Sequence, residues 1–196
     1  MISCWRKNLV AGNCLKKFSP LSFGLLQVHT FNRNVEIKKM QKKFLGKEQA
    51  LQKLRHYCGY QERSHQDVIQ KLWDLGVQKK EHDEIVATLI ENGYLNEERF
   101  ALQFAGGKFR INNWGKKKIL HALKEKQVSI YNINKALKNI DEEHYQKKLK
   151  KLLQKKYQSL KSEQYLVRKK KALDYMLQKG YELSLVSQAL LQIEKQ

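Results

Sequence analysis

The stretch VIQKLWDLGV (residues 68–77) decides the fold, because its pattern returns twice further along the chain. The copies are ILHALKEKQV (119–128) and ALDYMLQKGY (172–181), which begin 51 and then another 53 residues further on. In each copy, apolar residues at the first, second and fifth positions have the spacing of one helix face, and another apolar residue stands at the tenth. A repeat of this length indicates an array of small stacked units.

The ends of the predicted helices carry their own signals. Gly76 and Gly180 stand at the ninth position of their copies, where a left-handed residue commonly closes a helix. Gln127 takes that position in the middle copy, so we expect some backbone strain there. Ser64, with Asp67 three residues later, has the spacing of an N-terminal cap.

Further apolar stripes complete each unit. A helix is predicted in front of each copy, over residues 48–58, 97–110 and 143–158, and a third helical stripe follows each turn. These stripes are core positions rather than a cofactor site.

These units predict an all-α fold of three tandem three-helix repeats, over residues 46–96, 97–141 and 142–196. A single unit has a small core, so we expect the three to share interfaces in an elongated, curved, solenoid-like body.

The composition points to a negatively charged partner. The chain has 39 lysine and arginine residues against 19 aspartate and glutamate residues, a net charge of +20. This charge predicts binding to nucleic acid, an anionic membrane surface or an acidic protein face, while a lysine-rich face that contacts only solvent is the other interpretation. No run of about 18 apolar residues occurs, so we expect no membrane-spanning helix.

The first 45 residues differ from the repeats. Glu36 is the only acidic residue among residues 1–39, and basic, small and scattered apolar residues surround it. We predict that residues 1–45 form a basic, poorly ordered segment without a fold of its own. Three origins stay open: an organellar transit peptide, translation that starts at Met40, and a basic arm that adds to polyanion binding.

Residues that carry catalysis in other proteins form no recognisable arrangement here. Cys4, Cys14 and Cys58 include no CxxC pair, which favours a reducing compartment over a disulfide scaffold. The six histidines lack metal-ligand spacing, and neither a phosphate-binding loop nor a GxSxG elbow is present. We therefore predict that the protein is not an enzyme and uses no cofactor or metal.

A basic stretch at the end of the helix predicted over 97–110 is the first candidate binding region. Its candidate residues, which we call the middle patch, are Arg110, Trp114, Lys116 and Lys117. Trp114 is either a core residue or a large anchor for a partner. Gly106 and Gly107 are expected to loosen the helix end and to admit another backbone closely.

A second basic stretch spans residues 147–171 and contains a single acidic residue, Glu163. Its candidates, which we call the C-terminal patch, are Lys147, Lys148, Lys151, Lys155, Arg168, Lys169 and Lys170. Contact with DNA phosphates or with an acidic protein groove is one interpretation, and a solvated outer face is the other.

Two runs of sequence resemble a known family. The run GYLNEERFALQFAGGKFRINNWGKKKILHALKEKQV (93–128) resembles the signature region of RecX regulatory proteins, and RSHQDVIQKLWDLGV (63–77) resembles their opening motif. Arg99 matches the family pattern, as either an ion-pair partner or a contact residue. The chain departs from the pattern at Asn96 and over residues 104–107.

The resemblance implies a regulator of the RecA recombinase that is built from three-helix repeats. Such proteins lodge in the groove of the filament that RecA forms on single-stranded DNA. There they inhibit recombinase and co-protease activity, as part of DNA repair and the SOS response. We accordingly expect a cytoplasmic monomer whose partners are the RecA filament and single-stranded DNA, with double-stranded DNA as a further candidate and no membrane. The alternative is a helical-repeat module that binds DNA nonspecifically.

Overall fold

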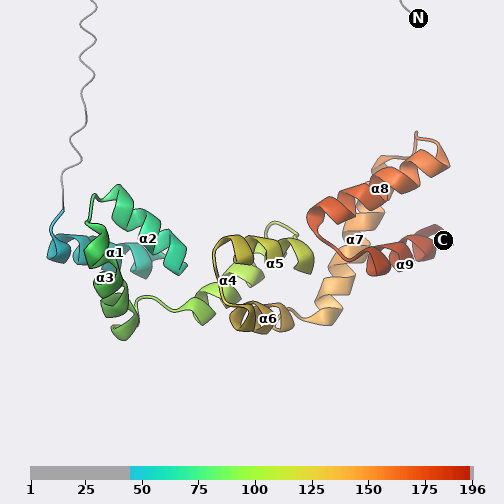
Figure 1. The fold of residues 1–196 in the computed structure, drawn as a ribbon. Helices are drawn as coiled ribbons and strands as arrows, with labels where there is room; N and C mark the ends of the chain where they lie inside the picture. The colour runs from blue at the N-terminus through green and yellow to red at the C-terminus, as the bar shows by residue number, and fades with distance from the viewer. Residues whose placement is uncertain (1–44, 195–196) are drawn as a thin grey trace, which may run out of the picture. The chain divides into compact units, whose positions relative to one another are not determined.

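The computed structural model describes residues 45–194, and every regular element in that part of the chain is an α-helix (Figure 1). The first repeat comprises α1 (Lys47–Tyr60), α2 (His65–Asp74) and α3 (Lys79–Glu91). The second comprises α4 (Glu97–Arg110), α5 (Lys116–Glu125) and α6 (Ile130–Lys138), and the third α7 (Glu142–Ser159), α8 (Tyr165–Lys179) and α9 (Leu183–Glu194). The predicted all-α fold of tandem three-helix repeats is confirmed.

The predictions for residues 1–45, including a start at Met40, lie outside the described residues apart from residue 45 itself. Within residues 45–194, no helix is both long and apolar enough to cross a membrane.

The second helix of every repeat ends in the same turn. Gly76, Gln127 and Gly180 have φ angles of 74°, 57° and 87°, all in the predicted left-handed region. The residue after each of them donates its backbone N–H to the carbonyl five residues earlier, in the pairs Val77–Leu72, Val128–Leu123 and Tyr181–Met176. Gln127 adopts this conformation with a side chain, so the middle repeat carries the strain that a non-glycine residue has there.

The start of α2 is capped as predicted. Ser64 Oγ accepts the backbone N–H of Asp67 at 3.1 Å, and the Asp67 carboxylate accepts the N–H of Ser64 at 3.3 Å. The same carboxylate pairs with Lys126 Nζ at 2.7 Å. Because Lys126 follows α5, the cap of α2 also links the first repeat to the second.

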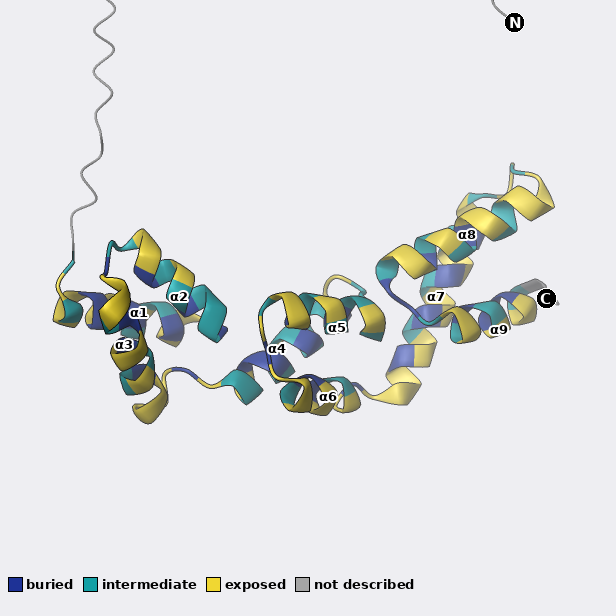
Figure 2. Ribbon diagram, in the orientation of Figure 1, coloured by how far each residue is buried: buried dark blue, intermediate teal, exposed yellow. Residues whose placement is uncertain are grey.

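The described repeats enclose two hydrophobic cores (Figure 2). Helices α1–α3 surround the first, which includes Leu54 and Leu72. Helices α4–α9 surround the second, where the Tyr145 ring centroid lies 5.7 Å from that of Phe109 and 5.1 Å from that of Tyr181. The second and third repeats therefore form one packed unit, whereas the first has a core of its own.

Two glycines bring the second and third repeats into backbone contact. The N–H of Gly115 donates to the Lys179 carbonyl at 2.8 Å, and the N–H of Lys117 donates to the Gly180 carbonyl at 3.1 Å. A Cβ added to Gly115 would lie 2.3 Å from the carbonyl carbon and oxygen of Gly180. This separation is too short for any side chain, so the joint requires glycine.

The glycine pair in α4 does not play the predicted part. Gly106 and Gly107 lie within α4, which continues to Arg110. A Cβ at Gly106 would first meet the Arg110 guanidinium, and a Cβ at Gly107 would meet nothing within 4 Å. The prediction that the pair loosens the helix end and admits another backbone is wrong, because the close approach occurs at Gly115.

Candidate interaction surface

The end of α4 lies beside the start of α7, and this brings parts of the two predicted patches together. Lys148 Nζ donates to the backbone carbonyls of Phe109 and Arg110 at 3.2 and 2.8 Å, and so satisfies carbonyls that the end of α4 leaves without helical partners. Burial, together with the charges of Arg110 and Lys151, lowers the pKa of Lys148. Arg110 of the middle patch therefore lies close to Lys148 and Lys151 of the C-terminal patch. We call these three cations, together with the exposed Lys117 and Lys155, the α4–α7 surface.

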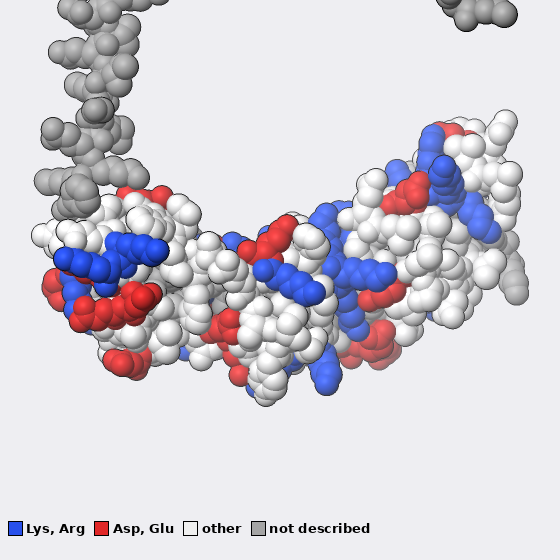
Figure 3. All heavy atoms as spheres, in the orientation of Figure 1, with Lys and Arg blue, Asp and Glu red and all other residues white. Residues whose placement is uncertain are grey.

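Several cations of the α4–α7 surface face solvent. Arg110 in the last turn of α4 and Lys117 in the first turn of α5 are exposed, as are Lys151 and Lys155 on α7. Figure 3 shows basic side chains gathered where the second repeat meets the third. Among the described residues, none of these four forms an ion pair. Their charges therefore remain available for a negatively charged partner. Lys147, by contrast, pairs with Glu143 at 2.6 Å.

Lys116 belongs to the joint between the second and third repeats. Its Nζ lies 2.6 Å from Glu142 Oε2, and its backbone N–H donates to the Tyr145 hydroxyl at 3.1 Å. That hydroxyl donates in turn to Glu182 Oε2 at 2.6 Å. Burial and the hydrogen bond to Glu182 raise the pKa of Tyr145, so it stays protonated as a donor. The side chain and the backbone of Lys116 thus both bind residues of α7.

Trp114 is a core residue that keeps part of its ring at the surface. Its side chain is partly buried and packs against the second core. The ammonium groups of Lys108 and Lys118 lie 5.0 and 4.9 Å from its ring centroid, within the range of a cation–π interaction. It also lines a shallow hollow with Lys117 and Leu177. Trp114 therefore supports the core and presents part of its ring beside the exposed cations.

Four lysines of the C-terminal patch lie on α7, and its other three residues lie on α8. Arg168 contacts the last turn of α7, where its Nε donates to the Tyr157 carbonyl at 2.9 Å and its guanidinium lies 3.5 Å from the Tyr157 ring centroid. Tyr157 is nine residues beyond Lys148, or about 14 Å along the helix, and Lys151 and Lys155 lie between them on α7. Lys169 and Lys170 follow Arg168 on α8, and Lys170 is exposed.

Exposed apolar side chains lie on α8 just before Arg168. Tyr165 and Leu166, in the first turn of α8, are 55% and 74% exposed. They precede the basic run at 168–171, so apolar and basic side chains share one end of α8. Tyr165 and Leu166 are not among the predicted site residues, because the C-terminal patch was defined by charge alone. The run YLVRKK (165–170) nevertheless combines apolar and basic residues.

Arg99 forms an ion pair and a hydrogen bond with residues of its own chain. Its Nε lies 3.0 Å from Glu62 Oε1, and its guanidinium donates to the Gly93 carbonyl at 2.8 Å. It therefore links the loop before α2 to the loop before α4, while its side chain is still about half exposed.

Glu97 is a structural residue that sequence reasoning missed. Its carboxylate accepts hydrogen bonds from the backbone N–H and the hydroxyl of Ser129, at 3.0 and 2.8 Å, and from the amide of Asn132. It thus joins the start of α4 to the start of α6. The pattern gave no signal for this contact, because an acidic residue in a first turn is common on any helix.

The described part of the chain contains neither a metal-binding cluster nor an exposed thiol. No three histidine, cysteine, aspartate or glutamate side chains among residues 45–194 are close enough together to hold a metal ion. Cys58 is buried in the first core, and this burial raises the pKa of its thiol to about 11. The thiolate is thus disfavoured at neutral pH.

Comparison with known families matches two of the three repeats. The model of the RecX second three-helix domain matches residues 96–137, and that of the RecX third three-helix domain matches residues 142–190. The chain belongs to the RecX family. The two matched RecX domains are the repeats that share the second core and carry the α4–α7 surface.

Curated relatives in the RecX family cover part of the chain. Regulatory protein RecX of Oceanobacillus iheyensis is 27% identical over 139 residues, which are 71% of this chain and 51% of that protein. Regulatory protein RecX of Lactobacillus johnsonii is 31% identical over 96 residues, 49% of this chain and 35% of that one. The chain thus spans about half or less of the length of these relatives.

Solved RecX structures share the fold. A crystal structure of regulatory protein RecX matches with a TM-score of 0.68 at 19% identity and covers 76% of this chain and 72% of its own. RecX from Lactobacillus salivarius matches with the same score and identity over 76% of this chain and 97% of its own.

Proposed function

We propose that this RecX family protein regulates the RecA recombinase by binding the filament that RecA forms on single-stranded DNA. In this role it inhibits recombinase and co-protease activity during DNA repair and the SOS response, acts in the cytoplasm, and works by binding rather than by catalysis. The observation that carries the proposal is the α4–α7 surface, where cations distant in sequence face solvent together. A filament of protein and DNA offers both carboxylates and phosphates to such a surface.

The surface of α8 supports a protein partner in addition to DNA. Phosphate backbones attract lysine and arginine, but they offer nothing to an exposed leucine. Leu166 is 74% exposed and lies one helical turn before the exposed Lys170. A mixed apolar and basic surface of this kind is typical of a protein interface, in which apolar side chains supply affinity and charges supply orientation.

Charge reversal on the α4–α7 surface tests this proposal. Arg110→Glu combined with Lys117→Glu should weaken binding to preformed RecA filaments by at least about tenfold, because two attractive contacts become repulsive. Cosedimentation with filaments measures the binding, and circular dichroism should show unchanged helix content, since both side chains are exposed.

Lys79→Glu combined with Lys80→Glu is the matched control for this experiment. Both lysines are exposed on α3 and lie outside the predicted patches, and the change in net charge is the same. Equal loss in both variants would remove the α4–α7 surface from the proposal, because net charge alone would then explain the binding.

A nonspecific DNA-binding module is the second candidate, favoured by the net charge of +20. Binding driven by phosphate contacts should weaken steeply with salt, with a slope of about −0.7 per phosphate for single strands. Binding to a protein groove should persist at moderate salt and require assembled filament. A salt titration on free DNA and on filament therefore separates the two candidates.

A further inference from the structure

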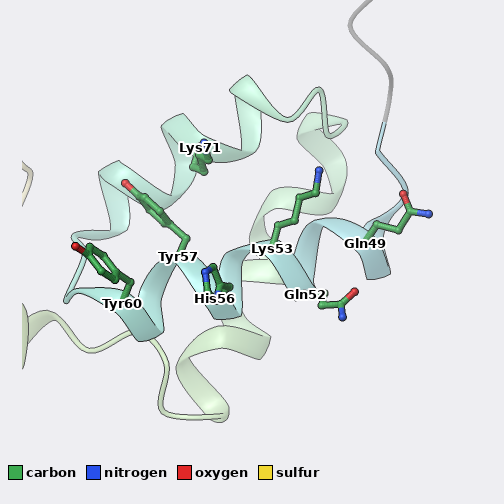
Figure 4. Close-up of a pocket in the computed structure, with 7 residues that line it drawn as sticks. All are labelled: Gln49, Gln52, Lys53, His56, Tyr57, Tyr60 and Lys71. Atoms are coloured by element: carbon green, nitrogen blue, oxygen red, sulfur yellow. The ribbon is translucent and has the colours of Figure 1, made fainter.

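A groove of about 950 Å³ lies between α1 and α2, outside both predicted patches (Figure 4). The side chains that line it are Gln49, Gln52, Lys53, His56, Tyr57, Tyr60 and Lys71. Figure 4 shows six of them along α1, from Gln49 at one end to Tyr60 at the other, and Lys71 on α2. Along α1 these residues extend over about 17 Å, at 1.5 Å per residue.

Tyr60 is the ring in this groove that is open to a partner. It is the last residue of α1, and 83% of its surface is exposed, the highest value among the large apolar residues described. Tyr57, by contrast, is partly buried, and the Arg63 guanidinium lies 4.0 Å from its ring centroid. A flat, exposed ring at a groove end suits a ligand with a flat face of its own.

The groove is basic as well as aromatic. Lys53 and Lys71 line it, and none of its seven lining residues is acidic. Its lining therefore complements a negatively charged ligand. Residues 1–45 are basic and carry the same sign of charge, so they are not the polyanion that the groove fits.

We propose that this groove binds single-stranded nucleic acid, with a base stacked on Tyr60 and phosphates paired with Lys53 and Lys71. An aromatic platform beside lysines is the combination that holds unpaired bases without reading their sequence. Paired bases are already stacked and hide their faces, so the groove discriminates against duplex. The site does not depend on RecA, and it supplies the first repeat with a role separate from the α4–α7 surface.

The test compares two oligonucleotides with the same phosphate backbone, one of thymidines and one of abasic sites, by fluorescence anisotropy with the full chain and no recombinase. Tyr60→Ala should weaken binding to the thymidine strand by about 5- to 150-fold, the usual range for loss of one stacked base. It should leave binding to the abasic strand unchanged, because the lysines remain. Tyr60→Phe should retain the affinity of the wild-type protein.

Tyr131→Ala is the matched control, because Tyr131 is 73% exposed on α6, far in sequence from the groove. It should bind both strands as the wild-type protein does. Equal affinity of wild-type protein and Tyr60→Ala for the thymidine strand would overturn the proposal, as would equal losses on both strands or no binding at all. Because RecA is absent from the assay, such a failure leaves the proposed regulation of RecA to its own tests.

Discussion

Individual polar residues connect helices that are distant in sequence, and Glu97 shows how. Burial by itself would raise the pKa of its carboxyl, but the hydrogen bonds from Ser129 and Asn132 outweigh this and lower it. A carboxyl with a lowered pKa stabilises the folded state only while it is ionised. Its contribution is therefore complete above the ordinary pKa of 4.5 and disappears as the pH falls through the lowered value.

We predict that Glu97→Gln destabilises the protein by about 1 kcal/mol at pH 7, because a neutral amide accepts weaker hydrogen bonds. The difference from the wild-type protein should shrink as the pH falls below 4.5. Urea unfolding at a series of pH values measures it. Glu91→Gln, at an exposed position at the end of α3, should show no such dependence. A difference that stays constant with pH would contradict this account of Glu97.

For single residues on the surface, the sequence predicts exposure better than it predicts which groups a side chain binds. The basic residues of both patches are exposed or partly exposed in the structure, and their role in binding stays a prediction. Charge could not show that Lys148 and Arg168 bind carbonyls of their own chain, 38 and 11 residues away. Such contacts depend on how helices pack, and no local pattern encodes the packing.

At the scale of helices and turns, the sequence predicted most of the fold. The apolar spacing in the three copies located the second helix of each repeat, and Gly76 and Gly180 located the turns that end them. The sequence offers no local signal for the contact of Gly115, because its partner Gly180 lies 65 positions further along. Local signals such as caps and turns can be recognised in sequence, whereas contact between two backbones cannot.

Gly115→Ala should destabilise the unit formed by α4–α9. The new Cβ would lie 2.3 Å from the Gly180 carbonyl, so the backbones must separate and weaken the hydrogen bond to Lys179. We expect a loss of about 1–3 kcal/mol, the usual cost of overpacking.

Gly59→Ala is the control for this joint. Gly59 lies in α1, and a Cβ there would meet nothing within 4 Å, so the change should stabilise the helix by about 0.5–1 kcal/mol. Chemical denaturation of both variants measures the two effects. A Gly115→Ala protein as stable as the wild type would show that the joint is not tightly packed.

At the scale of the whole described chain, two cores imply two cooperative units. The first surrounds Leu72 in α1–α3, and the second surrounds Leu123 in α4–α9. Both leucines are fully buried, so replacement by alanine should cost about 2–5 kcal/mol in the unit concerned.

Native-state hydrogen exchange should localise these losses. Leu123→Ala should reduce amide protection throughout α4–α9 and leave α1–α3 largely protected, and Leu72→Ala should do the reverse. If either variant reduced protection equally over the whole range 47–194, the described chain would instead unfold as a single unit.

The ATPase activity of RecA on single-stranded DNA tests the central claim most directly, with this protein added at substoichiometric amounts. A regulator that acts on the filament should inhibit hydrolysis at a low ratio to RecA, and excess free DNA should not relieve the inhibition. Inhibition that disappears with excess DNA, or no inhibition at all, would contradict the claim and leave a basic helical-repeat protein that binds DNA without regard to RecA.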